Sequence, residues 1–532
     1  MKQLAHLAVC TLMTAAVFAS ECSKTSSGLT PLNDPFYFSP DPLREGGLYP
    51  GRSNVRPAAH EAAGLAQAAL VVPRDAGGSP NAASGRIVFL SIGMSNTTQE
   101  FTAFRQLAAA DSDRDPRVTV VDGAQGGWTA AGILANPDTY FNVITQRLTA
   151  AGATAAQVQA AWVKEADASP SNGFPAYARQ LQTELASLAR MLRVRYPNLR
   201  LAYLSSRIYG GYASSNLNPE PYAYESGFSV KWVIADQIQG NPELSYASGT
   251  SPWLAWGPYL WADGLTMRED GLTWACAEFE QDGTHPGPAA EQKVGRMLLD
   301  FLHSDTTARL WYLRPVQTAT PAIVGVSNAA SGAPSVAAGS IASIYGSDLA
   351  AAAVEASALP LPFALGGTTV SVGGQFAPLF YASPKQVNFL VPRALTGADV
   401  VVSRGGNAAA KSALATALYA PGIFITGGVA AALHSDYSLV TLASPAKAGE
   451  AILLYFTGRG SINPLLMLPV ALPQVRVGNQ IATMLWNGPA PGFPGLDQMN
   501  FVVPPGTQAG KSPVVVGFLG AASNAADLPV GP

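Results

Sequence analysis

The sequence predicts an α/β domain with three layers around a mostly parallel sheet, followed by two β-sandwich modules. Three observations predict this arrangement. Short apolar runs alternate with helical stretches between residues 85 and 312. Beyond Trp311 the composition shifts to Val, Ala, Gly, Ser and Pro, with little helical period. Two segments of this second part recur about 110 residues further along, as expected of a repeat one domain long.

Four apolar runs predict the strands of the first domain. Each run is short and ends close to a turn residue, which is typical of parallel strands buried on both faces. A helix is predicted over 174–196, where leucines recur mostly at three- and four-residue steps, and a helix over 289–303 closes the domain. Alternating strands and helices favour a parallel sheet covered on both faces. The predicted strands cover residues 86–92, 117–121, 158–163 and 199–204.

The N-terminus has the features of a secretory signal peptide over residues 1–20. Lys2 supplies the charged start, an apolar stretch follows over 7–18, and residues 17–19 offer a cleavage site. The apolar stretch is too short for a comfortable membrane span. We therefore expect an exported protein, extracellular or periplasmic, in which residues 21–84 form an irregular leader that wraps the surface.

Cys22 follows the predicted cleavage site closely, and three fates are open to it. It could carry a lipid, although Glu21 stands where lipid attachment requires a small residue. It could pair with Cys276 in an oxidising compartment, or both thiols could stay unpaired. The three cysteines and five histidines do not have zinc-ligand spacing, so we expect no metal and no cofactor.

The composition narrows the class of partner. Of the 532 residues, 48% are hydrophobic and 13% are charged, so the chain can bury large cores. A net charge of −3 provides no basic field, which excludes nucleic acid as the expected partner. No later stretch approaches the roughly 18 uninterrupted apolar residues of a membrane span, so we expect none.

The internal repeat defines the second half of the chain. Gln-Val-Asn-Phe-Leu-Val-Pro at 386–392 recurs as Gln-Met-Asn-Phe-Val-Val-Pro at 498–504, and the segment at 339–345 is echoed at 449–455. Short alternating strands with Gly and Pro turns suggest β-sandwiches of the immunoglobulin-like kind. We place the two modules at residues 321–432 and 433–532.

These modules resemble a C-terminal β-rich module of secreted proteins of Acidobacteria, of the Solibacter type. The resemblance covers about residues 321–532 and implies an extracellular setting, but no known activity. We expect a spacer or adhesion role, with contact to the cell surface or to a polysaccharide, and no chemistry of its own.

Three segments of the first domain carry residues suited to nucleophilic catalysis. Gly93-Met94-Ser95-Asn96 directly follows the first predicted strand and would place Ser95 at the start of a helix, where N–H groups favour negative charge. The alternative is that Ser95 or Asn96 only caps that helix. Because strand ends in open α/β sheets commonly carry ligand-binding groups, the position itself favours a site.

The other two segments lie after the second strand and late in the domain. Residues 122–128 contain three glycines that bring N–H groups close to a ligand, unless they form a plain turn. In the Asp282-Gly-Thr-His285 segment, a spacing of three lets the carboxylate meet Nδ1 of His285 and leaves Nε2 free for a serine. The alternative is a turn with an incidental histidine, in which Pro286 begins the next helix.

Together the three segments resemble the SGNH (GDSL-like) hydrolase superfamily over residues 86–310. Gly-Met-Ser-Asn is similar to the Gly-Gln-Ser-Asn of its sialate O-acetylesterase and acetylxylan esterase branch. The resemblance implies a triad of Ser95, His285 and Asp282, with oxyanion donors from the N–H groups of Ser95 and Gly127. Lys164 stands where that branch has an amide, so it either donates to the oxyanion or pairs with Glu165 or Asp167.

Five further residues are candidates for substrate contact. Arg207 and Tyr209 follow the fourth predicted strand, and Trp261 belongs to a tryptophan-rich stretch whose indole faces suit sugar rings. The alternative for this stretch is ordinary packing of large aromatic residues. Asn96 and Glu165 complete the set, since they neighbour the nucleophile segment and the oxyanion segment.

The expected function is that of a secreted serine esterase that removes small acyl groups, acetyl above all, from a carbohydrate through an acyl-enzyme. One alternative is a carbohydrate-binding or cell-surface protein on a decayed hydrolase fold, which the unusual Lys164 motivates. A lipase or thioesterase would share the triad and differ only in the shape of its pocket.

Overall fold

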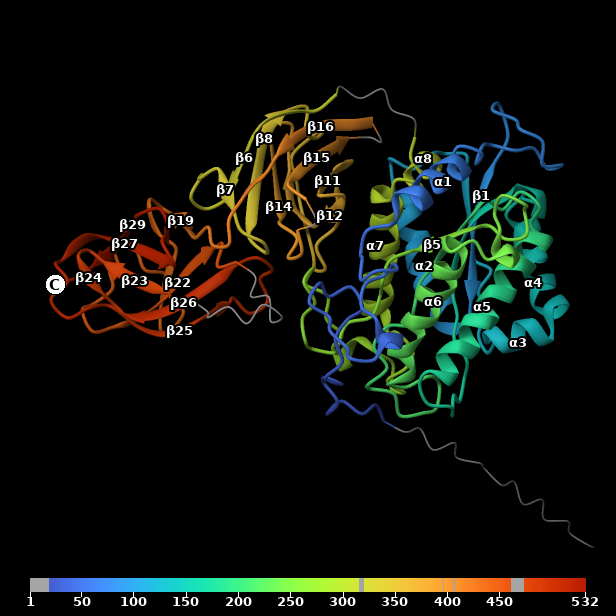
Figure 1. The fold of residues 1–532 in the computed structure, drawn as a ribbon, viewed down its shortest axis with the longest axis horizontal. Helices are drawn as coiled ribbons and strands as arrows, with labels where there is room; N and C mark the ends of the chain where they lie inside the picture. Colours follow the sequence, from blue (N-terminus) through green and yellow to red (C-terminus); the bar gives the residue numbers. More distant parts are fainter. Residues whose placement is uncertain (1–18, 315–319, 396, 405–406, 461–472) are drawn as a thin grey trace, which may run out of the picture.

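The computed structural model describes residues 19–314, 320–395, 397–404, 407–460 and 473–532. It comprises an N-terminal α/β region and a C-terminal β-rich region made of two successive units, which extend to one side in Figure 1. Nearly all of the predicted signal peptide lies outside the described residues, and so does Cys10.

A parallel sheet of five strands forms the centre of the α/β region. Its strand order is β2-β1-β3-β4-β5, and every neighbouring pair is parallel. Every residue of β1 and β3 is buried, which explains why these strands read as continuous apolar runs. The strands are β1 (Ile87–Gly93), β2 (Val118–Val121), β3 (Val158–Lys164), β4 (Leu201–Leu204) and β5 (Trp253–Trp256).

Strand β5 was missed by the sequence prediction, which assigned its tryptophans to a loop. Trp253 and Trp256 lie in this edge strand and are almost fully buried. A short run of buried residues has no alternation, so periodicity alone cannot tell it from packed loop.

Helices cover both faces of the sheet. Phe89 of β1 contacts Phe101 of α2 and Tyr203 of β4 contacts Phe301 of α7, so α2 and α7 lie on one face. Gly295 lets these two helices approach closely, because a Cβ there would lie 2.8 Å from the Phe104 backbone nitrogen. Helices α5 and α6 pack together on the other face. The helices are α2 (Ser95–Ala110), α3 (Ala130–Ala135), α4 (Pro137–Ala150), α5 (Ala176–Arg195), α6 (Tyr222–Ile238), α7 (Pro288–Ser304) and α8 (Arg309–Tyr312), with 3-10 turns η2 (Ala155–Gln157), η3 (Pro242–Leu244) and η4 (Cys276–Glu278).

The segment 21–84 is more ordered than predicted. It contains helix α1 (Ala58–Ala68) and the 3-10 turn η1 (Pro42–Arg44). The ring of His60 on α1 stacks on Trp253 with centroids 4.8 Å apart, and Leu32 is fully buried. The prediction of an irregular leader was therefore wrong at α1, where tertiary packing on β5 supplies the stabilisation that an alanine-rich helix lacks alone.

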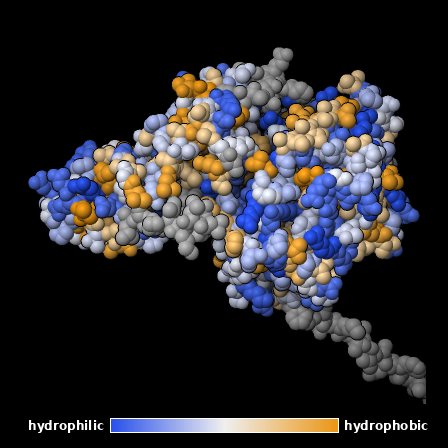
Figure 2. All heavy atoms as spheres, in the orientation of Figure 1, coloured by the Kyte–Doolittle hydropathy of each residue, from blue (hydrophilic) through white to orange (hydrophobic). Residues whose placement is uncertain are grey.

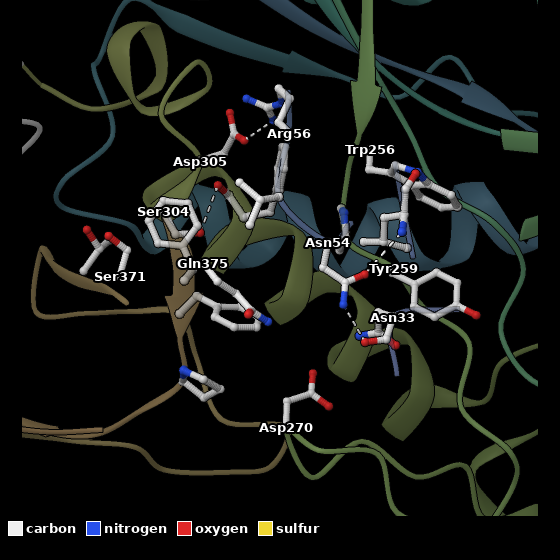
Figure 3. Close-up of a pocket in the computed structure, with 18 of the residues that line it drawn as sticks. Asn33, Asn54, Arg56, Trp256, Tyr259, Asp270, Ser304, Asp305, Ser371 and Gln375 are labelled. Atoms are coloured by element: carbon white, nitrogen blue, oxygen red, sulfur yellow. Dashed lines mark hydrogen bonds and ion pairs between the residues drawn. The ribbon is translucent and has the colours of Figure 1, made fainter. Parts of the chain in front are cut away.

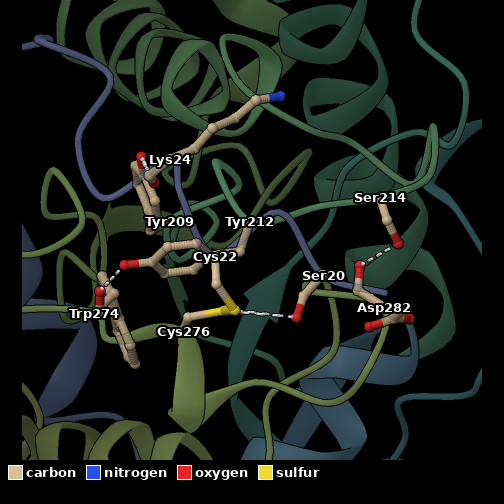
Figure 4. Close-up of a disulfide and its surroundings, with 9 residues drawn as sticks. All are labelled: Ser20, Cys22, Lys24, Tyr209, Tyr212, Ser214, Trp274, Cys276 and Asp282. Atoms are coloured by element: carbon tan, nitrogen blue, oxygen red, sulfur yellow. Dashed lines mark hydrogen bonds between the residues drawn. A yellow bond between two sulfur atoms is a disulfide. The ribbon is translucent and has the colours of Figure 1, made fainter. Parts of the chain in front are cut away.

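A disulfide fastens the start of this segment to the domain. Cys22 and Cys276 are bonded, with their Cα atoms 5.4 Å apart (Figure 4). Of the three fates left open by the sequence, the structure selects pairing. A sulfur in a disulfide is not free to carry a lipid, so lipidation of Cys22 is incompatible with this bond.

The first β-rich unit has two antiparallel sheets that share one core. Val387 and Phe389 from one sheet meet Val370 and Val400 from the other. One sheet contains β6 (Ala322–Asn328), β8 (Ile341–Ser347), β14 (Gln386–Leu390), β13 (Leu379–Ala382) and β9 (Val354–Glu355). The other contains β10 (Ala364–Leu365), β11 (Thr368–Val372), β12 (Gln375–Ala377), β15 (Asp399–Arg404) and β16 (Asn407–Ala413); β7 (Ser335–Val336) and β17 (Ala415–Thr416) pair separately.

The second unit repeats this plan with its own core. Its first strand already pairs with β22, so the unit begins near residue 422, earlier than the boundary predicted at 432. One sheet contains β18 (Gly422–Ile423), β21 (Ala432–His434), β22 (Ala451–Thr457), β25 (Thr483–Pro489) and β26 (Asp497–Val502). The other contains β23 (Gln474–Val477), β24 (Gln480–Ile481), β27 (Gly510–Phe518), β28 (Ala521–Ala522) and β29 (Ala526–Val530); β19 (Ile425–Thr426) and β20 (Val429–Ala430) form a hairpin.

The sequence repeat has a structural counterpart. In the first unit Gln386 lies opposite Tyr345 in an antiparallel pair, and in the second Gln498 lies opposite Tyr455. The two echoed segments therefore pair with each other in the same register in both units.

Within the described ranges, no helix combines the length and the apolar character that crossing a bilayer requires. On the face seen in Figure 2, hydrophilic residues dominate and apolar residues form scattered patches.

Candidate functional site

Ser95 is presented at the junction of β1 and α2. Strand β1 ends at Gly93, and α2 begins at Ser95 with Met94 as its N-cap residue. No side chain caps the helix, so the alternative in which Ser95 or Asn96 serves as a cap is wrong. Gly93 is required here because a Cβ would lie 2.5 Å from the Lys164 carbonyl oxygen.

The structure brings Ser95, His285 and Asp282 together. Ser95 Oγ lies 2.8 Å from His285 Nε2, and His285 Nδ1 lies 2.5 Å from Asp282 Oδ2. The second carboxylate oxygen of Asp282 accepts the N–H groups of Thr284, at 2.9 Å, and His285, at 3.0 Å. His285 and Asp282 lie with Ser95 at the edge of the sheet where the strands end, which we call the rim. Both side chains reach solvent there, since 25% of His285 and 33% of Asp282 is exposed.

Hydrogen bonds keep Asp282 ionised. Partial burial raises the pKa of this carboxyl, but donation from the His285 backbone and ring and from Thr284 outweighs burial. The net result is a pKa below the ordinary value for aspartate. An ionised carboxylate fixes the adjacent imidazole with its proton on Nδ1 and leaves Nε2 as the acceptor that faces Ser95.

The loop that carries Asp282 and His285 is held from three sides. Asn96 Nδ2 donates to the Thr284 carbonyl at 2.8 Å, and the Ser214 N–H donates to the Asp282 carbonyl at 3.0 Å. Gly283 has a φ of +63° and packs directly on the Tyr212 carbonyl, so a side chain there is excluded. Asn96, predicted to contact substrate, instead ties the nucleophile helix to this loop. Helix α7 then begins at Pro288 and not at Pro286.

The glycine segment after β2 reaches the same rim. Gln125 N–H donates to the Gly93 carbonyl at 2.9 Å, which anchors the segment beside the nucleophile turn. A Cβ on Gly126 would lie 3.8 Å from Ser95 Cβ, whereas the corresponding point on Gly127 has no atom within 4 Å. Of the two adjacent glycines, Gly126 therefore has its Cα turned toward Ser95, and the oxyanion role of the Gly127 N–H stays a prediction.

Lys164 does not face the site, contrary to the oxyanion role considered for it. Its Nζ donates to both carboxylate oxygens of Glu100 on α2, each at 2.6 Å, and both side chains are fully buried. The partners suggested by the sequence, Glu165 and Asp167, are also wrong. Lys164 is the last residue of β3, and its side chain points to the face of the sheet that α2 covers. Burial lowers the pKa of Lys164 to about 8.

Glu100 was missed by the sequence analysis. It stands beside Phe101 on the buried side of α2, and the partner that stabilises it lies 64 residues away on β3. The one signal in the sequence was that Glu100, a charged residue, stands at a core-facing position of an amphipathic helix.

Glu165, predicted to contact substrate, is a buried carboxyl. It is 2% exposed, and neither carboxylate oxygen has a hydrogen-bond partner in the described part of the chain. Burial, followed by the charge of Asp167, raises the pKa of Glu165 well above its ordinary range.

Of the three other predicted contacts, only Arg207 lies next to the nucleophile turn. Its Nη1 is 3.8 Å from Met94 Sδ, its Nε is unpartnered within the described residues, and the side chain is 2% exposed. Tyr209 and Trp261 are core residues, because the Tyr209 hydroxyl donates to the Lys24 carbonyl and Trp261 Nε1 donates to Glu220. The alternative of ordinary aromatic packing describes Trp261 correctly.

Among the described residues, no three His, Cys, Asp or Glu side chains lie close enough to hold a metal ion. The chemistry that this rim offers consists of a hydroxyl, an imidazole, a carboxylate and the N–H groups around Ser95.

The comparisons with known proteins leave the family open. No protein-family model and no curated protein matches the chain. Among solved structures, the chain is similar to SGBP-B from a xyloglucan utilization locus of Bacteroides uniformis, with 14% identity over 40% of this chain and 50% of that one, at a TM-score of 0.15. An auxiliary nutrient binding protein of Bacteroides thetaiotaomicron matches at 12% identity over 32% and 41%, with a TM-score of 0.14. The titin tandem I9–I11 matches at 11% over 40% and 66%, with a TM-score of 0.13. The chain thus spans half the length of SGBP-B, and such low TM-scores do not establish a common fold.

Proposed function

We propose that the protein is an exported serine hydrolase of the SGNH (GDSL-like) type that cleaves small acyl esters, acetyl above all, on a carbohydrate. The observation that carries the proposal is the chain of contacts from Ser95 Oγ through His285 to Asp282. The strand order and the place of Ser95 at the carboxyl end of β1 support it, because ligands of open α/β sheets bind at that edge.

The proposed reaction begins at Ser95. His285 Nε2 takes the hydroxyl proton while Oγ attacks the ester carbonyl, and Asp282 stabilises the imidazolium that forms. The N–H groups of Ser95, Gly126 and Gly127 are the candidate donors for the oxyanion, and none of the three donates elsewhere in the described part of the chain. His285 then protonates the departing alcohol, which leaves an acyl-enzyme on Ser95. Water, deprotonated by the same nitrogen, releases the acid and restores the serine.

The Cys22–Cys276 disulfide supports export, because such bonds persist in oxidising compartments. We assign the two β-rich units to immunoglobulin-like sandwiches that contact a polysaccharide or the cell surface. The paired sheets of each unit, with one shared core, support that assignment.

The direct test is an esterase assay on residues 20–532. Wild type should hydrolyse p-nitrophenyl acetate and release acetate from acetylated xylan, and Ser95→Ala should lose at least about 10³-fold in kcat. Ser112→Ala is the matched control, since this exposed serine lies in a turn away from the site. Equal turnover by Ser95→Ala and Ser112→Ala would reject Ser95 as the nucleophile.

A second candidate function has one observation in its favour. Lys164 is bound to Glu100, so no side-chain amide or amine supplements the backbone oxyanion donors at that position. A carbohydrate-binding protein on a decayed hydrolase fold would lack such a side-chain donor. A fluorophosphonate probe separates the two: labelling that disappears in Ser95→Ala supports the hydrolase, and glycan binding without labelling supports the second function. A series of p-nitrophenyl esters from acetate to octanoate tests for a lipase or thioesterase.

A further inference from the structure

A cavity of about 610 Å³ lies between the α/β region and the first β-rich unit (Figure 3). Its walls come from three parts of the chain: the segment before α1, the α7 side of the α/β region, and strands β11 and β12 of the first unit. The volume falls in the range of sites that hold small molecules. It is separate from the Ser95 site, none of whose triad residues lines it.

The cations in the cavity wall are already neutralised. Arg56 binds Glu61 and Asp305, and Arg268 forms a bidentate pair with Asp270. The wall also holds Arg309, whose charge lies near those of Asp305 and Glu61, so three guanidinium groups face three carboxylates and these six groups carry no net charge.

Two further wall carboxyls form no ion pair among the described residues. Glu269 accepts the backbone N–H of Arg393, at 2.8 Å, and the charge of that arginine opposes the effect of burial on the carboxyl. The Asp300 carboxyl has no hydrogen-bond partner among the same residues; the nearest charges are Arg296 and His303 on its own helix, and His303 is bonded to Asp111. Burial raises the pKa of both Glu269 and Asp300 to about 7, and it outweighs the opposing charges of Arg393 near Glu269 and of His303 and Arg296 near Asp300.

The remaining free groups of the wall include both donors and acceptors, and the buried Arg309 Nε has no acceptor in the described part of the chain. Asn33 Oδ1 is buried with no donor in the described part of the chain. Across the cavity, the first β-rich unit contributes the hydroxyl of Ser371 and the amide of Gln375, with half-buried phenyl rings at Phe363 and Phe376. A ligand that satisfies this wall must bring donors, acceptors and one positive charge, and must also offer apolar surface to the rings.

We propose that this cavity binds a ligand with a primary ammonium group on a hydroxylated scaffold of one or two rings, that is, an amino sugar with a free amine. The ammonium supplies three donors and the ion-pair partner that Glu269 and Asp300 lack among the described residues. The ring hydroxyls suit Asn33, Ser371 and Gln375, while the apolar face of a sugar packs on phenylalanine rings. Such a ligand contacts both the α/β region and the first β-rich unit and so strengthens the junction between them. At this junction the Leu361 N–H already donates to the Asp270 carbonyl at 2.9 Å.

Calorimetric titration of residues 20–532 carrying Ser95→Ala tests the proposal without depending on catalysis. The probes are the β-1,4-linked glucosamine disaccharide, its di-N-acetylated form and spermidine. We expect the free-amine disaccharide to bind at least about 10-fold more tightly than the acetylated one, because acetylation removes the charge. Spermidine should bind more weakly, since it lacks hydroxyls and rings.

Variants locate the binding. Asp300→Asn and Glu269→Gln should each weaken the disaccharide at least about 10-fold. Glu243→Gln, an exposed carboxylate paired with Arg190 on the far side of α5, is the matched control and should bind like the parent. Thermal unfolding of each variant verifies that it is folded. Equal binding of the acetylated sugar, tighter binding of spermidine, no binding at all, or no effect of either cavity variant would each overturn the proposal.

Discussion

Ser95 and His285 are 190 residues apart in the sequence, yet Oγ of the serine and Nε2 of the histidine lie 2.8 Å apart. The contact joins the end of the first strand to a loop that follows the last one. It depends on the parallel sheet, because only parallel strands end at a common edge in this way. Any substitution that moves the turn between β1 and α2, or the loop that carries Asp282, should therefore change this distance.

Removing the carboxylate tests the tautomer that the geometry implies. Asp282→Asn leaves a side chain of equal size but takes away the acceptor for the Nδ1 proton. We expect kcat for p-nitrophenyl acetate to fall about 10³–10⁴-fold with little change in KM. Asp236→Asn, a carboxylate change on α6 away from the rim, is the control. A loss below 10-fold in Asp282→Asn would show that His285 does not need this partner.

Asn96 should act as a positioning residue. Its amide is the link between α2 and the Thr284 carbonyl, so Asn96→Ala frees the loop without touching the triad. We expect a fall of about 10-fold in kcat, an unchanged KM and a loss of about 1 kcal/mol in stability. The exposed Asn142→Ala is the matched control. A rise in KM with unchanged kcat would instead assign Asn96 to substrate binding.

The Lys164–Glu100 pair should behave as a buried ion pair. Lys164→Met leaves the Glu100 carboxylate without a partner and should cost about 3–5 kcal/mol of unfolding free energy in urea. The double variant Lys164→Met with Glu100→Leu should recover most of that loss. Turnover of the double variant should stay within a few-fold of wild type, because neither side chain faces the rim. A drop beyond 10²-fold in a folded double variant would restore Lys164 as an oxyanion donor.

The disulfide should support both stability and turnover. It closes a loop of 254 residues in sequence separation, for which chain entropy predicts about 5 kcal/mol, and strain or residual structure reduces the gain to about 2–4. It also holds the segment in which the Glu21 N–H donates to the Tyr212 carbonyl, on which Gly283 packs. Cys22→Ser with Cys276→Ser should therefore lower both the melting temperature and kcat. Treatment of wild type with dithiothreitol should reproduce both effects, and an unchanged melting temperature would contradict this account.

Asp300 gives a pH dependence whose sign is opposite to that of most carboxylates. Its pKa is raised from 3.8 to about 7 by burial, so between these values the folded state holds a proton that the unfolded state has lost. The contribution of this group to stability is thus present below about pH 4 and lost as the pH rises to 7. Asp300→Asn should gain about 1–3 kcal/mol relative to wild type between pH 4.5 and pH 8, after allowance for solvent in the cavity. A constant difference across that range would show that the carboxyl titrates normally.

Much of the α/β region could be predicted because its signals are local. The runs that became β1 to β4 and the leucine pattern of α5 match the observed elements closely, and the spacing of Asp282 and His285 allowed their contact. What could not be predicted depends on distant partners. Lys164 bonds to Glu100, Trp261 bonds to Glu220, and His60 of α1 stacks on Trp253. These partners are far apart in the sequence, so a single sequence does not indicate that they meet. Asn96, Tyr209 and Trp261 were predicted to contact substrate for this reason, although their side chains are bonded to Thr284, Lys24 and Glu220.

The three separate cores have a thermodynamic consequence. The α/β region, the first β-rich unit and the second each bury their own set of apolar side chains. Unfolding is cooperative only within one core, so the α/β region and the two β-rich units form separate blocks that can unfold at different temperatures. A heat-capacity trace of the whole molecule then sums overlapping peaks, and no one midpoint characterises it. The free energies given above for Lys164 and Asn96 refer to the first block alone, whose peak must be resolved from the other two before they can be read.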